Sequence, residues 1–396
     1  MQPIEIQPIP PITPKEKPEL KVLSTAAQWY TLGELLSSPD LREYQEAKRF
    51  AEQYGVSLRD LGFFKDTAQK VERHAQLHFE MKRLKEQMEP LIEMTRKDGS
   101  HPIIDEFLAQ QGRITLVENE DGSGGSYFAK IGGECRYIVK PADEDVCGFN
   151  NRKGVALPIS IFESLNFEFS PYKAPQNDLM MYDLALIMGI QESVPETAMM
   201  IVENQGFYDH FKEVDDLTKK LALDTGAGPD DQKLCTVQRF VKESKTLAET
   251  WHDILASGKG SFDQTSFENL NILFWLSFES DGHMGNILAT VKGIDSEGNK
   301  IYALKKIDST FSFPKSDEYS GNADAYMSNG QERLSERAKQ LIQNTDPDLI
   351  VKRMGQLGYD QEHQTAMQRR VERLKTLAQE DLTIREIDQK MGGMDR

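Results

Sequence analysis

Residues 280–288 read SDGHMGNIL and interrupt a largely apolar part of the chain. The apolar run before them ends at Phe278 and predicts a helix, and Ile287 begins a predicted strand. Asp281 and Asn286 are therefore expected five residues apart on one tight loop. A carboxylate and an amide oxygen held on such a loop can face an acceptor hydroxyl and a metal ion, a combination that suits phosphoryl transfer.

Two other parts of the chain supply further groups of this kind. A strand predicted over 302–307 leads to Asp308, and an acid at this place can ligate Mg²⁺ between two phosphates. Upstream, a glycine-rich turn at 121–126 lies between two β-like runs. Glycine lets a backbone approach phosphate closely, so this turn is a candidate cover for a triphosphate.

Lys140 ends the apolar strand that follows this glycine turn, where its ammonium group can reach phosphates. Such a lysine needs an acidic partner to hold it. We expect that partner to be Asp183 on a helix predicted over 177–189, with Asp178 and Glu168 as alternatives.

Residues 281–288 resemble the Asp-Arg-His-x-x-Asn catalytic loop of the phosphatidylinositol 3-/4-kinase superfamily. Residues 307–314, IDSTFSFP, resemble the metal-binding motif of the same superfamily. The nucleotide-loop region over 124–153 and the strands within 194–241 look most like those of type II phosphatidylinositol 4-kinases. These short motifs follow one another in the order of the family over residues 115–320.

The resemblance implies an α+β, two-lobed kinase-like fold, with a β-rich N-lobe, a helical C-lobe and helical extensions at both ends. It also implies an Mg-ATP-dependent phosphotransferase with ATP and Mg²⁺ (or Mn²⁺) as cofactors. Together with the expectation for Asp183, the ATP-binding residues are then Gly124, Gly125, Ser126, Lys140, Asp183, Phe240 and Val241; the catalytic residues are Asp281 and His283; and the metal ligands are Asn286 and Asp308.

The position of each residue in the family motifs implies its role. Ser126 would lie in the loop over the phosphates, and Phe240 and Val241 would line the adenine, with a backbone amide bonded to it. Asp281 would act as the base or position the acceptor. His283 would support the transferred phosphate.

The chain departs from the family pattern at several positions. Gly282 stands where the superfamily usually has Arg, and the segment 309–332 is acidic and aromatic with Lys315 as its one basic residue. We therefore expect the acceptor to be an uncharged hydroxyl of phosphatidylinositol or of a protein, because this segment repels a phosphorylated inositol. Two alternatives stay open: a protein Ser/Thr kinase on the same fold, and a nucleotide-binding pseudokinase scaffold.

Composition narrows the classes of partner. The chain has 396 residues and a net charge of −17, which disfavours binding to nucleic acid and allows at most peripheral contact with anionic membranes. Its three cysteines lack the spacing of a disulfide framework or a zinc site. No signal peptide or transmembrane segment is apparent, so we expect a cytoplasmic protein, or a secreted effector delivered to a host cytosol.

Four regions are predicted along the chain. Residues 1–22 are proline-rich and expected to be disordered, and residues 23–109 are expected to form a helical N-terminal module. Residues 110–345 are the predicted catalytic domain, and 346–396 a helical C-terminal extension. The two helical ends are candidate surfaces for a protein partner. One amphipathic face of the C-terminal extension is made by Met367, Val371, Leu374 and Leu377.

Overall fold

The computed structural model describes residues 99–120, 125–144, 173–207, 232–251, 260–279, 282–315 and 331–392, with parts of 82–97. The chain divides into two compact units, and apart from Lys82 the described residues all belong to the unit formed by Arg83–Tyr208 and Asp230–Arg396. The predicted tail at 1–22 and most of the predicted module at 23–109 lie outside the described residues. Apart from residues 209–229, which belong to the other unit, the regions predicted at 110–345 and 346–396 lie in this one unit.

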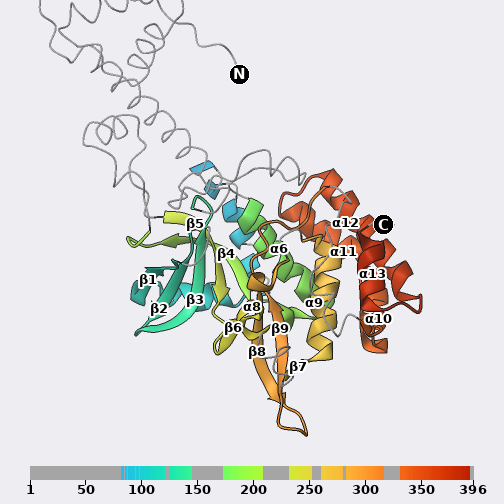
Figure 1. Cartoon of the computed structure of the whole chain (residues 1–396). Helices are drawn as coiled ribbons and strands as arrows, with labels where there is room; N and C mark the ends of the chain where they lie inside the picture. Colours follow the sequence, from blue (N-terminus) through green and yellow to red (C-terminus); the bar gives the residue numbers. More distant parts are fainter. Residues whose placement is uncertain are drawn as a thin grey trace, which may run out of the picture. The chain divides into compact units, whose positions relative to one another are not determined.

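The first lobe is built on an antiparallel sheet of five strands in the order β1-β2-β3-β5-β4 (Figure 1). The strands are β1 (Ile114–Glu118), β2 (Tyr127–Ile131), β3 (Glu134–Pro141), β4 (Thr197–Glu203) and β5 (Gln232–Arg239). In β3, Tyr137 and Val139 are buried in the core while Lys140 is only partly buried, as the two-residue period of a strand requires. A short helix, α4 (Ile103–Leu108), contributes Ile103 and Phe107 to the same core.

Helix α6 (Lys173–Met188) lies between this sheet and the helices of the second lobe (Figure 1). It contacts β4 and β5 as well as α9 (Gln264–Ser277) and α11 (Pro347–Gln356). Its residues from 174 to 185 are all buried, because the helix has neighbours on every side. Any side chain that this helix presents to one lobe is therefore positioned by both lobes.

Helix α9 brings the chain to the loop that reads SDGHMGNIL. It begins at Asp263, whose carboxylate accepts a hydrogen bond from the N–H of Ser266 over 2.9 Å. It ends at Phe278, whose left-handed backbone with a φ of 47° turns the chain out of the helix. The predicted end of the helix at this residue is confirmed.

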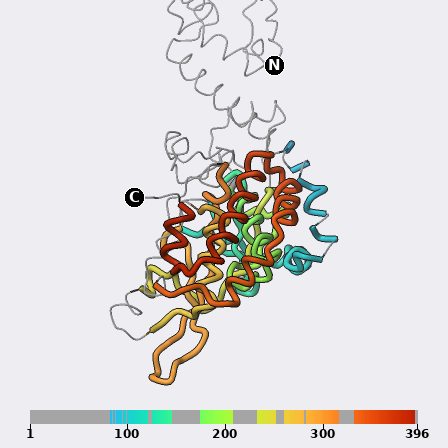
Figure 2. The backbone as a smooth tube through the Cα atoms, turned by 90° about the vertical axis from the view of Figure 1, so that its right-hand side faces the viewer, coloured from blue at the N-terminus to red at the C-terminus, as the bar shows by residue number. Residues whose placement is uncertain are grey.

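A second sheet of four strands, in the order β6-β8-β9-β7, belongs to the second lobe. Its strands are β6 (Ser244–Thr246), β7 (Gly260–Phe262), β8 (Ile287–Ile294) and β9 (Lys300–Lys306). The short elements around them are α8 (Leu247–Trp251), η3 (Gln191–Ser193) and η6 (Met284–Asn286), whereas η2 (Gln111–Arg113) precedes β1 of the first sheet. The antiparallel hairpin of β8 and β9 extends away from the helices in both views (Figures 1 and 2). Its second strand delivers the chain to Asp308.

Four helices close the chain and lie together in Figure 2: α10 (Glu336–Asn344), α11, α12 (Gln361–Ala378) and α13 (Ile384–Met391). Their N-caps are side chains of the preferred types, Ser335, Asp346, Asp360 and Thr383. The predicted apolar face of α12 is buried. These helices pack on α9 and on the turn after it. Trp275 Nε1 of α9 donates to Asp388 of α13 over 2.9 Å, and the guanidinium group of Arg370 in α12 lies 4.2 Å from the centre of the Phe278 ring.

The predicted α+β, two-lobed kinase-like fold is confirmed: a β-rich first lobe precedes a second lobe dominated by helices. The strands expected around 114–117 and 135–140 lie in β1 and β3, and the helix expected at 177–189 lies in α6. Within the described residues, no helix combines the length and the apolar character that crossing a membrane would require.

Candidate functional site

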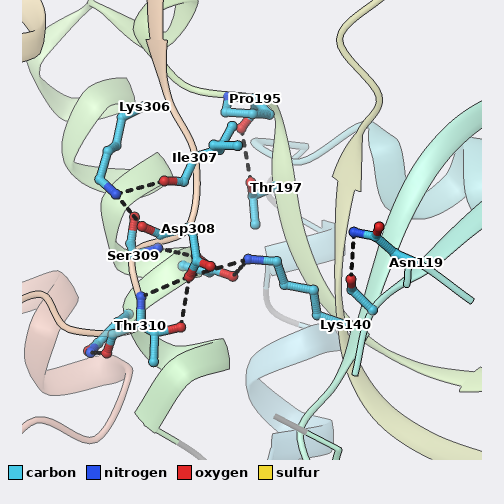
Figure 3. A network of polar contacts seen from close by, with 12 residues as sticks. Asn119, Lys140, Pro195, Thr197, Lys306, Ile307, Asp308, Ser309 and Thr310 are labelled. Carbon is cyan, nitrogen blue, oxygen red and sulfur yellow. Dashed lines mark hydrogen bonds and ion pairs between the residues drawn. The ribbon is translucent and has the colours of Figure 1, made fainter. Parts of the chain in front are cut away.

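Three charged side chains from three separate elements meet beside the first sheet (Figure 3). Lys140 stands at the end of β3, Asp178 on α6, and Asp308 directly after β9. The ammonium group of Lys140 lies 3.0 Å from Asp178 Oδ2 and 3.7 Å from Asp308 Oδ1. Asp178 is buried, whereas the side chain of Asp308 is 44% exposed. The cluster therefore has one closed side and one side that faces solvent.

The expected pairing of Lys140 with Asp183 is wrong, because Asp178 is the partner that the ammonium group meets. Asp183 lies on the same helix but is bonded elsewhere. Its two carboxylate oxygens lie 2.9 Å from His101 Nε2 and 2.6 Å from the Nε of Arg353. Five residues of α-helix rotate a side chain by well over a quarter turn, so Asp178 and Asp183 leave the helix toward different neighbours.

Asp308 adopts a left-handed backbone conformation with a φ of 55°. Its carboxylate accepts from the hydroxyl of Thr310 over 2.8 Å. Burial on its own would raise the pKa of Asp308, but the charges of Lys140 and Lys306 and the hydrogen bonds from Thr310 outweigh it and lower the pKa to about 2. The carboxylate is therefore ionised at neutral pH.

Lys306 lies behind Asp308 and is almost fully buried. Its ammonium group donates to the carbonyl oxygens of Ile307, over 2.6 Å, and of Asp308 (Figure 3). It also lies 3.4 Å from the buried carboxylate of Glu279, which accepts in turn from Ser312. This buried lysine joins the turn after α9 to the segment that carries Asp308, and it holds the carbonyl of the left-handed residue.

The loop between α9 and β8 is tied to Asp308 by the backbone. The N–H of Ile307 donates to the carbonyl oxygen of Asn286 over 3.0 Å, so Asn286 and Asp308 are held close along paired chains. His283 is exposed, and its Nδ1 accepts from the N–H of Gly285 over 3.0 Å. In the neutral ring, that bond leaves the proton on Nε2. Asp281, the expected base, lies outside the described residues.

The glycine turn leads into a buried cluster of charges. Gly124 lies outside the described residues, and Gly125 donates its N–H to the carbonyl oxygen of Glu144 over 2.7 Å. A Cβ at Gly125 would lie 2.4 Å from the Glu144 Cβ, so this approach requires glycine. Ser126 is buried, and its hydroxyl accepts from Asn119 over 3.2 Å across the hairpin.

Glu144 is itself held by two side chains. Its carboxylate lies 2.6 Å from Lys233 Nζ and accepts from the Tyr127 hydroxyl over 2.5 Å. Lys233 also pairs with Asp143 over 2.8 Å. Burial raises the pKa of Glu144 to about 7, against the opposing effect of Lys233. Burial acts to lower the pKa of Lys233, but the charges of Asp143 and Glu144 raise it above its usual value.

Phe240 and Val241 connect β5 to β6 and so lie between the lobes. Both are half-buried, and the Phe240 ring meets the Phe128 ring edge to face at 6.3 Å. The N–H of Phe240 donates to the carbonyl oxygen of Arg136 over 2.9 Å. Of the two residues expected to line adenine, Phe240 therefore has its backbone N–H already bonded within the protein.

The oxygen donors present suit a metal ion that arrives with a nucleotide. Among the described residues, no group of three or more His, Cys, Asp and Glu side chains could hold a metal ion on its own. Mg²⁺ in phosphate-transfer sites takes one or two protein ligands together with phosphate oxygens and water. The ionised, partly exposed carboxylate of Asp308 and the nearby Asn286 have the chemistry of such a pair.

Several residues that build this site escaped the sequence analysis. Asn177 and Thr310 had no role there, and Lys306 appeared only as part of a strand. The strand period gives a signal for Lys306, since it stands on the same face as Tyr302 and Leu304, which are buried. A lysine on the core face of a strand is a charge that must have internal partners. No comparable signal marks Asn177 or Thr310.

Half of the chain is similar in sequence to part of a plant kinase. Over 201 residues, 50% of this chain, the sequence is 30% identical to phosphatidylinositol 4-kinase gamma 7 of Arabidopsis thaliana. The match spans 28% of the length of that plant protein, so the chain corresponds to only part of it. No protein-family model matches the chain.

One solved structure with a similar arrangement is that of the Golgi casein kinase. It is 13% identical in sequence, and the superposition has a TM-score of 0.41 and covers 74% of this chain and 77% of that one.

Proposed function

We propose that this protein is an Mg-ATP-dependent phosphotransferase that moves the γ-phosphate of ATP to an uncharged hydroxyl. The observation that carries the proposal is the meeting of Lys140, Asp178 and Asp308 at one open-sided cluster. A lysine held by a buried acid can bind the phosphates of a nucleoside triphosphate, and a second acid open to solvent can bind its metal ion. The partial similarity to a plant phosphatidylinositol 4-kinase supports the same reaction class.

The residues of the chain would divide the work as follows. Lys140 would bind phosphate oxygens, and Asp178 would fix its ammonium group in place. Asp308 and Asn286 would hold the metal ion, which neutralises charge on the phosphates when bound. Gly125 would bring the backbone close to the phosphates, as would its neighbours Gly124 and Ser126.

The remaining roles concern the adenine and the acceptor. Phe240 and Val241 would line the adenine. Asp281 would orient the acceptor hydroxyl or take its proton, and His283 would donate a hydrogen bond from Nε2 to the transferred phosphate. Positioning and charge compensation account for most of the rate in this reaction class, so each of these contacts matters for turnover.

The acceptor is proposed as phosphatidylinositol or a protein hydroxyl, in a cytoplasmic setting that includes a host cytosol for an exported effector. The decisive experiment offers radiolabelled ATP with Mg²⁺ or Mn²⁺ to phosphatidylinositol vesicles and, separately, to a panel of proteins. We expect label in one acceptor class, and a loss of about 100-fold or more in Asp308→Asn. Asp295→Asn, the same change in an exposed turn of the β8–β9 hairpin, is the matched control and should keep full activity.

The outcomes separate the proposal from its alternatives. Label in phosphatidylinositol supports a lipid kinase, and label in proteins alone supports a protein kinase on the same fold. A melting temperature raised by MgATP without transfer to either class indicates a nucleotide-binding pseudokinase. If MgATP and MnATP change neither the melting temperature nor any acceptor, the proposal is wrong.

A further inference from the structure

The turn between α11 and α12 is bonded to α6, the helix that carries Asp178. The segment 353–359 forms three side-chain hydrogen bonds with this helix. These are Arg353 Nε to Asp183 over 2.6 Å, Gln176 Nε2 to the carbonyl oxygen of Leu357 over 2.6 Å, and the Tyr359 hydroxyl to Asn177 Oδ1 over 2.6 Å. These bonds fall on both sides of Asp178 along the helix, so the C-terminal region fixes the part of α6 that faces the site.

The bond from Tyr359 continues toward the site through Asn177. The amide nitrogen of Asn177 lies 2.8 Å from the carbonyl oxygen of Thr310. A carbonyl oxygen only accepts, so the nitrogen of the amide must face Thr310 and its oxygen must face Tyr359. Asn177 and Tyr359 are both buried, which leaves the amide with one orientation and makes the hydroxyl of Tyr359 its donor.

Thr310 carries the connection to the carboxylate of Asp308. The hydroxyl of Thr310 donates to Asp308 Oδ1 over 2.8 Å, and the N–H of the adjacent Ser309 donates to Asp178 over 2.9 Å. The segment after β9 is thus anchored to α6 at two consecutive residues. Within this segment the Thr310 hydroxyl orients the carboxylate of Asp308, and Asn177 holds the backbone carbonyl of Thr310.

We propose that Tyr359 is a positioning residue for the carboxylate of Asp308, acting through Asn177 and Thr310. The inference rests on the proposed function, in which Asp308 holds the metal ion. The distance between Tyr359 and Asp308 is spanned by two other residues, so Tyr359 acts on the orientation of the carboxylate and not on the substrate. Loss of its hydroxyl weakens the metal site while leaving the pair of Lys140 and Asp178 in place.

Tyr359→Phe tests this with the least disturbance. The ring of Tyr359 packs edge to face on Phe313 and His363, with centroids 6.0 and 5.4 Å away, and phenylalanine keeps both contacts. At saturating ATP, we expect the Mg²⁺ concentration for half-maximal transfer to rise roughly fivefold to tenfold, the effect of about one buried hydrogen bond. The Kd for ATP without metal should stay unchanged, and a general loss of stability would not produce that separation.

Tyr302→Phe is the matched control, because Tyr302 is also buried and its hydroxyl has no hydrogen-bond partner in the part of the chain that the structure describes. It should leave the Mg²⁺ dependence unchanged. Thr310→Val keeps the backbone carbonyl that Asn177 contacts and removes the last bond of the same connection, from the Thr310 hydroxyl to Asp308. The double variant Tyr359→Phe/Thr310→Val should therefore cost less than the sum of the single changes. Asn177→Ala removes the central residue of the connection and should give the same shift. It provides the test if Tyr359→Phe folds poorly.

The inference and the proposed function fail in different ways. A wild-type protein that responds to MgATP, together with Tyr359→Phe and Asn177→Ala variants of unchanged Mg²⁺ dependence, overturns the role of Tyr359 alone. Additive effects in the double variant overturn it as well. A wild-type protein that does not respond to MgATP overturns the proposed function and this inference with it.

Discussion

Lys140 and Lys233 stand on the neighbouring strands β3 and β5, and each meets two carboxylates, yet the two clusters differ in exposure. The side chain of Lys233 is 4% exposed, and those of its partners Asp143 and Glu144 are 8% and 3% exposed. The side chain of Lys140 is 18% exposed, and its partner Asp308 is 44% exposed. The cluster around Lys233, here the closed cluster, compensates its charges entirely inside the protein. The cluster around Lys140, here the open cluster, keeps charge available to solvent. Burial of the partners therefore distinguishes a cluster suited to stability from one suited to binding.

The largest effect expected from this comparison is on stability at Lys233. Lys233→Met leaves the carboxylates of Asp143 and Glu144 buried without their cation, which should lower the free energy of unfolding by roughly 3–5 kcal/mol. Lys140→Met should cost less, because Asp178 keeps the hydrogen bond from the N–H of Ser309 and water reaches the cluster. Urea unfolding of both variants measures the difference. Equal losses would show that exposure does not separate the two clusters.

The second prediction concerns activity at the open cluster. Lys140→Met should reduce the rate of phosphoryl transfer by about 100-fold or more, because the phosphates lose their fixed positive charge. Initial rates at saturating MgATP measure this. Lys352→Met, the same change at an exposed position of α11, is the control and should keep the wild-type rate. A Lys140→Met variant with near wild-type turnover would remove this lysine from the proposed site.

The third prediction sharpens the connection between the closed cluster and the glycine turn. Gly125→Ala places a Cβ against the backbone and side chain of Glu144, which should lower the free energy of unfolding by about 1–3 kcal/mol. Gly112→Ala is the matched control, since a Cβ there meets no atom within 4 Å. Thermal or urea unfolding of the two variants compares them directly. Similar stability in both would mean that the turn moves aside without cost.

The fourth prediction concerns the pH dependence of the closed cluster. Folding raises the pKa of Glu144 from 4.5 to about 7, so the folded state binds a proton more tightly than the unfolded state. The resulting stabilisation is complete below pH 4.5 and is lost as the pH rises through about 7. At about 1.4 kcal/mol per pKa unit, we expect the free energy of unfolding to fall by about 3 kcal/mol over this range relative to Glu144→Gln. Parallel pH profiles for the two proteins would contradict this assignment.

Local patterns predicted much of the fold. The alternation in 135–140 places Tyr137 and Val139 in the core, and the spacing of the apolar residues in α12 identifies its buried face. These elements are buried on one side only, so their sequence records which side faces the core. The break at Phe278 was also predictable, because the polar loop that follows ends the apolar run.

The partner of Lys140 could not be predicted in the same way. Helix α6 is buried on every side, so its sequence contains no amphipathic pattern to show which face meets β3. Asp178 and Asp183 carry the same side chain and lie on the same helix. Only the packing of α11 and of the segment around His101 occupies Asp183 and leaves Asp178 to Lys140. The contributions of Asn177 and Tyr359 likewise depend on contacts between distant segments, which no local pattern records.

The anchoring of α6 has a consequence for how the protein folds during its synthesis. The hydrogen bond from Gln176 to Leu357 joins residues 181 positions apart, that from Tyr359 to Asn177 joins residues 182 positions apart, and that between Arg353 and Asp183 spans 170. Contacts of such long range form late, since the intervening chain must first be ordered. Helix α6 emerges from the ribosome long before the segment that anchors it, so a growing chain has its lysine and acids before it has their final arrangement. A fragment cut to residues 115–320 would stay at that stage, and expression of this protein for biochemistry should retain the helices up to Met391.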